Sequence, residues 1–113
     1  MANGKTQGEH RTGALYDRCV IDDPMCVSYL VGVGSVMRLV GAAHQDRDFT
    51  PALVAVLGVF GLCPARNTPV IGIILRGQFV AWIERNPDRK REPMASSAMA
   101  AFKEAWPCPE RSN

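Results

Sequence analysis

The amino-acid sequence predicts an all-α fold, a small disulfide-stabilised bundle of four to five short helices. Apolar residues recur at intervals of three and four, which is the period of one helix face. Proline follows an acidic or hydroxyl residue at several positions, and this combination is typical of helix starts. Four cysteines stand at the edges of the apolar segments, where a disulfide can tie one helix end to a neighbour.

The chain of 113 residues fits one domain with a modest hydrophobic core. We expect residues 1–11 to be a disordered tail or a cloning remnant, since they are polar and lack an apolar anchor. Residues 12–108 form the predicted helical domain, and residues 109–113 form a C-terminal tail.

Two helices are expected in the first third of the domain. Thr12 is the expected N-cap of a short helix that ends near Cys19. Asp22-Asp23-Pro24 begins a second helix, because an acidic cap precedes proline at the first helical position. Its glycines, Gly32 and Gly34, are expected to permit close contact with another helix. The inward face of this second helix is expected to hold Cys26, Tyr29, Leu30, Val33, Val36, Met37 and Val40.

The segment 51–62 is apolar at almost every position, so periodicity does not decide between helix and strand. Thr50-Pro51 resembles a helix cap and favours a helix, whereas the valines and glycines favour a strand. Both interpretations stay open.

Two further helices complete the expected bundle. Thr68-Pro69 precedes a helix over 70–85 that ends at Asn86-Pro87, and the last helix runs from near Pro93 to Pro107. The basic run 89–91 between them is flanked by carboxylates and is expected to be a solvated loop. The expected inward residues are Ile71, Ile74, Leu75, Phe79, Trp82 and Ile83 in the first helix, and Ala95, Ala98, Met99, Phe102 and Trp106 in the second.

The four cysteines, Cys19, Cys26, Cys63 and Cys108, allow three disulfide connectivities. In an up-and-down bundle, the end of the first helix meets the start of the second, and the start of the third long helix meets the end of the fourth. We therefore prefer the pairs Cys19–Cys26 and Cys63–Cys108, with the other two connectivities left open. Disulfides favour an oxidising compartment such as the periplasm, while four reduced thiols in a cytosolic protein are the alternative.

The sequence argues against several other classes of protein. The cysteines lack the short spacing of a zinc site, and the two histidines lie near no cysteine, so no metal, cofactor or catalytic residue is predicted. A net charge of +2 does not predict nucleic-acid binding. The sequence contains no run of about 18 consecutive apolar residues, so we predict no membrane insertion. The polar N-terminus lacks a signal-peptide core, so we expect any export signal to have been removed.

Four motifs in order resemble the Tai/Rap family of type VI secretion immunity proteins. The first is a leading helix that ends in Cys19. The second is the block from Cys26 to Val33, which resembles C-x-G-Y-[IL]-x-G-[VI], with serine at position 28 where glycine is common. The third is the Cys63-Pro64 turn with the helix that ends at 86–87, and the fourth is an alanine-rich helix closing on residues 106–108.

This resemblance implies a small, all-α, periplasmic protein that is often dimeric and has no catalytic function. The best-understood members bind and inhibit a peptidoglycan-cleaving amidase delivered by a neighbouring cell. The resemblance therefore implies that this protein occludes the active-site cleft of a cognate amidase effector and forms a homodimer.

The expected partner-binding residues are Asp46, Arg47, Asp48 and Phe49, in the segment 44–49. The carboxylates are expected to approach the active site of the amidase, and Phe49 to enter a pocket. The alternative is that the segment is merely solvated and that Phe49 packs on the next helix. A different function, an orphan periplasmic module or a chaperone for acid-stressed clients, is favoured by the apolar run 51–62.

Overall fold

The computed structural model describes residues 10–44, 61–64 and 70–109. In chain order its elements are α2 (Thr12–Val20), α3 (Pro24–His44), α5 (Gly72–Arg85), the 3-10 helix η1 (Pro87–Arg91) and α6 (Met94–Ala105). These ranges contain no β-strand, only an isolated bridge between Arg11 and Pro93. The prediction of an all-α fold is therefore confirmed, while the expected caps at 50 and 68, and most of the segment 51–62, lie outside the described residues.

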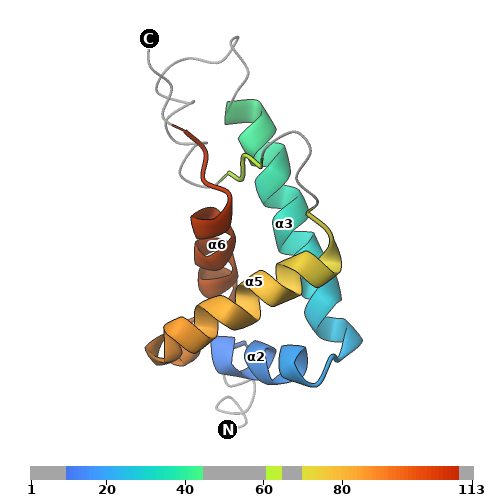
Figure 1. Cartoon of the computed structure of the whole chain (residues 1–113), viewed down its shortest axis with the longest axis vertical. Coiled ribbons are helices and arrows are strands. Elements are labelled where there is room, and N and C mark those ends of the chain that lie inside the picture. The colour runs from blue at the N-terminus through green and yellow to red at the C-terminus, as the bar shows by residue number, and fades with distance from the viewer. Residues whose placement is uncertain (1–9, 45–60, 65–69, 110–113) are drawn as a thin grey trace, which may run out of the picture.

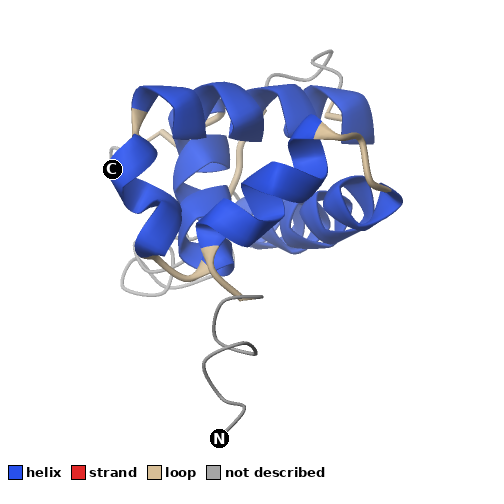
Figure 2. Ribbon diagram, turned by 90° about the horizontal axis from the view of Figure 1, so that it is seen from below, coloured by secondary structure: helices blue, strands red, loops and turns tan. Residues whose placement is uncertain are grey.

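The long helix α3 runs along one side of the molecule, and α5 crosses in front of it (Figure 1). Helix α2 lies across the base, and α6 lies beside α3. In the view from below, helices make up most of the described chain, and short loops join α2 to α3 and η1 to its neighbours α5 and α6 (Figure 2). The most extensive helix contacts are those of α5 with α3 and with α6, so α5 is the central packing element.

The hydrophobic core lies where the four α-helices meet. Phe79 of α5 and Phe102 of α6 are completely buried, as is Leu30 of α3. Burial of a large aliphatic or aromatic side chain contributes about 1.5–3 kcal/mol, so these contacts hold the bundle together. The buried hydrophobic residues are Leu15, Cys19, Cys26, Leu30, Met37, Leu62, Leu75, Phe79, Trp82, Ile83, Ala98, Ala101 and Phe102.

The start of α3 is capped as the sequence predicts. The carboxylate of Asp23 accepts a hydrogen bond from the Met25 amide at 2.9 Å, and the Asp23 carbonyl accepts one from the Cys26 amide at 2.9 Å. Pro24 occupies the first helical position, where its missing N–H leaves no partner unsatisfied. At the other end of the domain, α5 ends at Arg85 before Asn86-Pro87, again as predicted.

Thr12, in contrast, is not the cap of α2. Arg11 occupies the N-cap position, and Thr12 is the first residue of the helix. The Thr12 side chain is fully buried, and its hydroxyl is hydrogen-bonded to the Glu92 carbonyl at 2.8 Å and to the Ser97 hydroxyl at 2.7 Å. The start of α6 packs against α2 here, so the hydroxyl bonds to another element and not to its own helix.

Four side chains expected in the core lie on the surface instead. Helical periodicity identifies a stripe of residues, but the width of the buried part depends on how far the neighbouring helices extend. Helix α5 also begins at Gly72 and not at 70, so its first turn covers less of the core than expected. The exposed residues are Val36, Ile71, Ile74 and Ala95.

The basic run is not a free loop but forms the 3-10 helix η1. The Arg89 guanidinium lies 5.3 Å from the ring centroid of Trp82, and the Lys90 ammonium lies 4.6 Å from that of Tyr16. These cation–π contacts place the two basic side chains on α5 and α2, so the run packs onto the bundle.

Helix α3 is long and apolar enough to cross a membrane, by length and composition alone. Its window Pro24–Ala43 has a mean hydropathy of 1.6. The same helix packs against α2, α5 and α6, and Cys26 near its start is covalently bonded to α2. Core helices pass the same test, so the absence of membrane insertion stays a prediction.

Candidate partner-binding surface

The two disulfides join the cysteines in the preferred connectivity. Cys19 and Cys26 are bonded with their Cα atoms 5.0 Å apart, and Cys63 and Cys108 with theirs 4.7 Å apart. Both cysteines of the first pair are completely buried, whereas those of the second pair are half-buried. The preferred pairing is therefore confirmed, and each disulfide closes one end of the bundle.

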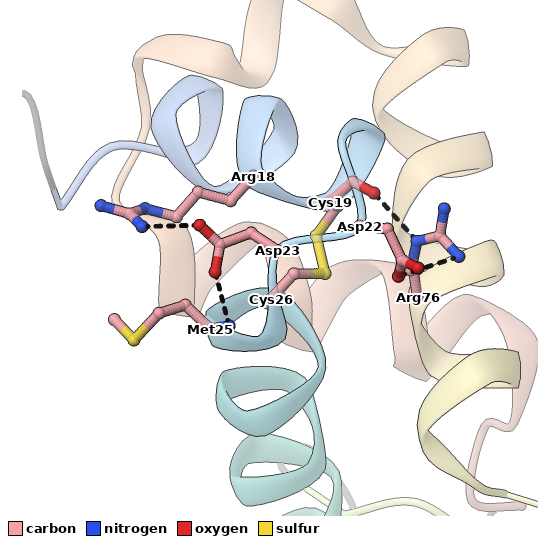
Figure 3. The surroundings of a disulfide bond; sticks show 7 residues. All are labelled: Arg18, Cys19, Asp22, Asp23, Met25, Cys26 and Arg76. Carbon is pink, nitrogen blue, oxygen red and sulfur yellow. Dashed lines mark hydrogen bonds and ion pairs between the residues drawn. A yellow bond between two sulfur atoms is a disulfide. The ribbon is translucent and has the colours of Figure 1, made fainter.

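The Cys19–Cys26 disulfide spans the turn that joins α2 to α3, residues 20–25, which we call the α2–α3 turn. Arg76 of α5 reaches this turn from the side (Figure 3). Its Nε donates a hydrogen bond to the Cys19 carbonyl at 2.9 Å, and its guanidinium lies 3.6 Å from the Asp22 carboxylate. On the other side, Arg18 is paired with Asp23 at 3.1 Å. The turn is thus attached to both α2 and α5.

Asp22 adopts a left-handed backbone conformation, with φ of 60°. Asparagine and aspartate tolerate this region better than most residues, and a tight reversal between two helices requires it. The reversal leaves aliphatic side chains in solvent, since the exposed fraction is 51% for Val20, 73% for Ile21 and 59% for Met25. The α2–α3 turn therefore combines a fixed backbone with exposed apolar side chains.

The second disulfide and two backbone hydrogen bonds fix the position of residues 61–64. The Leu62 amide donates a hydrogen bond to the Met37 carbonyl at 2.8 Å, and the Cys63 amide donates one to the Trp106 carbonyl at 3.1 Å. Residues 61–64 are consequently attached both to α3 and to the end of α6.

An apolar groove of about 630 Å³ opens between α3 and α6. Burial of Tyr29 in its wall raises the pKa of that hydroxyl group above its ordinary value, because the charged phenolate is disfavoured away from water. The groove offers almost no polar contact. Its lining residues are Ser28, Tyr29, Gly32, Val33, Val36, Met37, Val40, Ala95 and Met99.

The partner-binding residues that the sequence predicts, Asp46, Arg47, Asp48 and Phe49, lie outside the described residues. They follow directly after α3, which ends at His44. Sequence reasoning did not single out the α2–α3 turn or the groove as surfaces. The sequence signal for the turn is the apolar pair Val20-Ile21. This pair follows Cys19, the last inward residue of α2, and precedes the cap of α3.

Away from the groove, two ionisable side chains of the described residues have raised pKa values. Within ranges 10–44, 61–64 and 70–109, no group of three or more His, Cys, Asp and Glu side chains is placed to hold a metal ion. The Tyr16 hydroxyl donates a hydrogen bond to Glu84 at 3.0 Å, which raises the pKa of Tyr16. The hydrogen bonds of Arg89 to Glu92 raise the pKa of the guanidinium. Both shifts arise from pairs on the protein surface.

Comparison with known protein families identifies the chain. The model of the Rap1a immunity proteins matches residues 11–108, which includes every described helix and both disulfides. No curated protein and no solved structure matches the sequence significantly. The matched range includes all four sequence motifs. The chain therefore belongs to the Rap1a immunity protein family.

Proposed function

We propose that this protein is a periplasmic immunity protein that binds a type VI secreted peptidoglycan amidase and inhibits it by occluding the active-site cleft. The observation that carries this proposal is the family match over residues 11–108. The family identifies an immunity protein. The amidase target, the periplasmic location and the occlusion mechanism are the further steps that we propose.

The periplasmic location is supported by the two disulfides. Disulfides persist in oxidising compartments such as the bacterial periplasm and are rare in the cytosol. A peptidoglycan amidase acts in the same compartment, so inhibitor and target would meet there.

The inhibition mechanism requires a rigid surface and no catalytic group. Binding by a surface that is already ordered avoids the entropic cost of fixing side chains and loops at the interface. The two disulfides and the capped start of α3 supply such rigidity. We place the occluding residues at 46–49, immediately after α3, with Asp46 and Asp48 directed at the amidase and Phe49 as an apolar anchor.

The test is a titration of the oxidised protein against the amidase encoded beside its gene, following binding by calorimetry and cell-wall hydrolysis in parallel. We expect binding with loss of hydrolysis. Absence of binding, in a sample whose disulfides are confirmed by mass, would contradict the proposal. Substitution of both Asp46→Ala and Asp48→Ala tests the occluding segment. The matched control is Asp88→Ala, which removes an exposed carboxylate on η1.

Homodimer formation is a separate part of the proposal, and it rests on the family resemblance. Sedimentation of the oxidised protein over a concentration series checks it directly. A single monomeric species at all concentrations would contradict the homodimer and leave the inhibitory function intact.

The groove between α3 and α6 favours a second candidate function, a periplasmic module that holds unfolding client proteins. Its walls are apolar, and Val36 on its rim is exposed. Exposed apolar surface of this kind binds other apolar chains. Suppression of aggregation of a denatured client at low pH would support this candidate, and a lack of suppression, together with tight amidase binding, would exclude it.

A further inference from the structure

The α2–α3 turn is held in one conformation by a disulfide and by interactions of the Arg18, Asp23 and Arg76 side chains. The Cys19–Cys26 disulfide closes it covalently, and the Asp23 side chain caps α3 directly after it. Arg76 attaches it to α5, and Arg18 pairs with Asp23 across it. Such a turn loses little conformational freedom when a partner covers it, and low ordering cost is what favours binding at a small surface.

Three aliphatic or thioether side chains of this turn are directed into solvent. Single exposed apolar residues are common on protein surfaces, but Val20, Ile21 and Met25 fall within six residues of one another. Val20 and Met25 each adjoin a bridged cysteine, and the Cα atoms of those cysteines are 5.0 Å apart. The disulfide therefore holds together the two ends of a short segment that carries all three exposed apolar side chains.

Carboxylates accompany this apolar surface. Asp17 lies four residues before Ile21, and the Ile21 amide donates a hydrogen bond to the Asp17 carbonyl at 3.4 Å, so this exposed residue lies one helical turn before Ile21. Within the described part of the chain, Asp17 makes no ion pair. The Asp22 side chain is 73% exposed, although Arg76 lies beside it. Asp17, Asp22 and Asp23 carry three negative charges here, and Arg18 and Arg76 carry two positive ones, which leaves one net negative charge. A complementary surface would therefore carry positive charge around an apolar depression.

We propose that the α2–α3 turn is a second contact with the effector, in which Ile21 enters an apolar pocket that has lysine or arginine on its rim. This inference rests on the proposed function, since it names a part of the surface that the same amidase would contact. Helix α3 has 21 residues and is about 30 Å long; in the sequence the turn leads into its first residues, and residues 46–49 come after its last residue, His44. The two contacts are therefore testable separately.

The experiment compares Ile21→Ser with Leu39→Ser in calorimetric titrations against the amidase encoded beside the gene. Both side chains are 73% exposed, so both substitutions remove the same kind of apolar surface, but Leu39 is on the second half of α3. We expect Ile21→Ser to weaken binding about thirtyfold or more, as loss of a central interface residue does. We expect Leu39→Ser to leave the affinity within about threefold of the unsubstituted protein.

The charge of the pocket rim is tested with Asp17→Lys. We expect slower association with the amidase and an opposite or weaker dependence of the association rate on salt, because attraction between the two surfaces is removed. Circular dichroism and thermal unfolding verify that each variant keeps its fold, which is expected because all three positions are exposed.

Each further outcome has a defined meaning. Unchanged binding by Ile21→Ser overturns this inference and leaves the proposed function standing. Equal losses for Ile21→Ser and Leu39→Ser also overturn it, because the effect is then not specific to the turn. A change of oligomeric state in Ile21→Ser overturns it in favour of a contact between two copies of this chain. If the unsubstituted protein does not bind the amidase, the proposed function fails, and the inference fails with it.

Discussion

The hydroxyl groups of Thr12 and Ser97 are hydrogen-bonded to each other at 2.7 Å, although 85 residues separate them in the sequence. Both side chains are buried. The Thr12 amide also donates a hydrogen bond to the Glu92 carbonyl at 2.8 Å, so backbone and side chain together attach α2 to the start of α6. This buried polar contact joins the first and last helices of the described domain.

Replacing Thr12 with valine keeps the shape of the side chain and removes its hydroxyl. The Glu92 carbonyl and the Ser97 hydroxyl then lose a buried partner, and we expect the free energy of unfolding to fall by about 1–3 kcal/mol. Urea unfolding followed by circular dichroism measures the change. The control is the double variant Thr12→Val with Ser97→Ala, which should lose less than the sum of the two single losses, because the two hydroxyls are coupled. Strict additivity would show that the contact contributes nothing.

Two glycines of α3 provide a matched pair of substitutions with opposite expected signs. A Cβ atom at Gly41 would overlap the backbone carbonyl oxygen of Leu62, whereas a Cβ atom at Gly32 would meet no atom within 4 Å. Backbone atoms cannot move aside cheaply, so Gly41→Ala should lower the free energy of unfolding by roughly 2 kcal/mol or more. Gly32→Ala should raise it by about 0.5–1 kcal/mol through helix propensity.

Thermal and urea unfolding of both variants check these values. A Gly41→Ala variant as stable as the unsubstituted protein would contradict the close approach of residues 61–64 to α3. Of the two glycines expected to permit helix contact, Gly34 does so, because a Cβ atom there would lie 3.2 Å from Leu75. Gly32 faces the groove, so this part of the expectation is wrong.

The sequence predicts features that depend on neighbouring residues in the chain. The cap of α3 is of this kind, since Asp23 and Pro24 determine it by themselves. The Cys19–Cys26 pair also follows from local information, because a short connection places the two helix ends together. The Cys63–Cys108 pair spans 45 residues and was predicted from the up-and-down order of the helices. The all-α class needs only the period of the apolar residues.

Features that depend on contacts between distant elements were not predictable in this way. The burial of Thr12 depends on α6, and the requirement for glycine at position 41 depends on Leu62. Val36 fits the inward pattern of α3 but borders the open groove between α3 and α6 and is exposed. The α2–α3 turn becomes a candidate surface only once Arg76 is seen to attach it to α5.

Ionisation of the two tyrosines should occur at higher pH in the folded protein than in the unfolded chain. The hydrogen bond to Glu84 raises the pKa of Tyr16, and burial raises the pKa of Tyr29, both above the ordinary value of about 10. Because the folded pKa values are raised, the associated stability is fully present below pH of about 10 and is lost as the pH rises through the folded pKa values.

Ultraviolet absorbance of the phenolate group measures both transitions, since the chain contains two tyrosines. We expect the titration midpoint in buffer to exceed that in urea. The variant Tyr16→Phe should leave one transition, which belongs to Tyr29 and still exceeds that of the unfolded chain. A native midpoint equal to or below that of the unfolded protein would contradict the burial of Tyr29 and the hydrogen bond of Tyr16.

Removal of the Cys63–Cys108 disulfide should cost the protein a large part of its stability. This bond closes a loop with a sequence separation of 45 residues, and Cys19–Cys26 closes one with a separation of 7. Loop-closure entropy predicts losses of about 4 kcal/mol for the first and about 2 kcal/mol for the second, before any packing loss at the two fully buried sulfurs of Cys19 and Cys26. Urea unfolding of the paired Cys→Ala variants measures both.

A domain of this size has a total stability of about 5–15 kcal/mol, so loss of both bonds in a reducing compartment would leave much of the chain unfolded. A loss of less than about 1 kcal/mol for Cys63→Ala with Cys108→Ala would contradict this account, and it would also remove the stability argument for placing the protein in the periplasm.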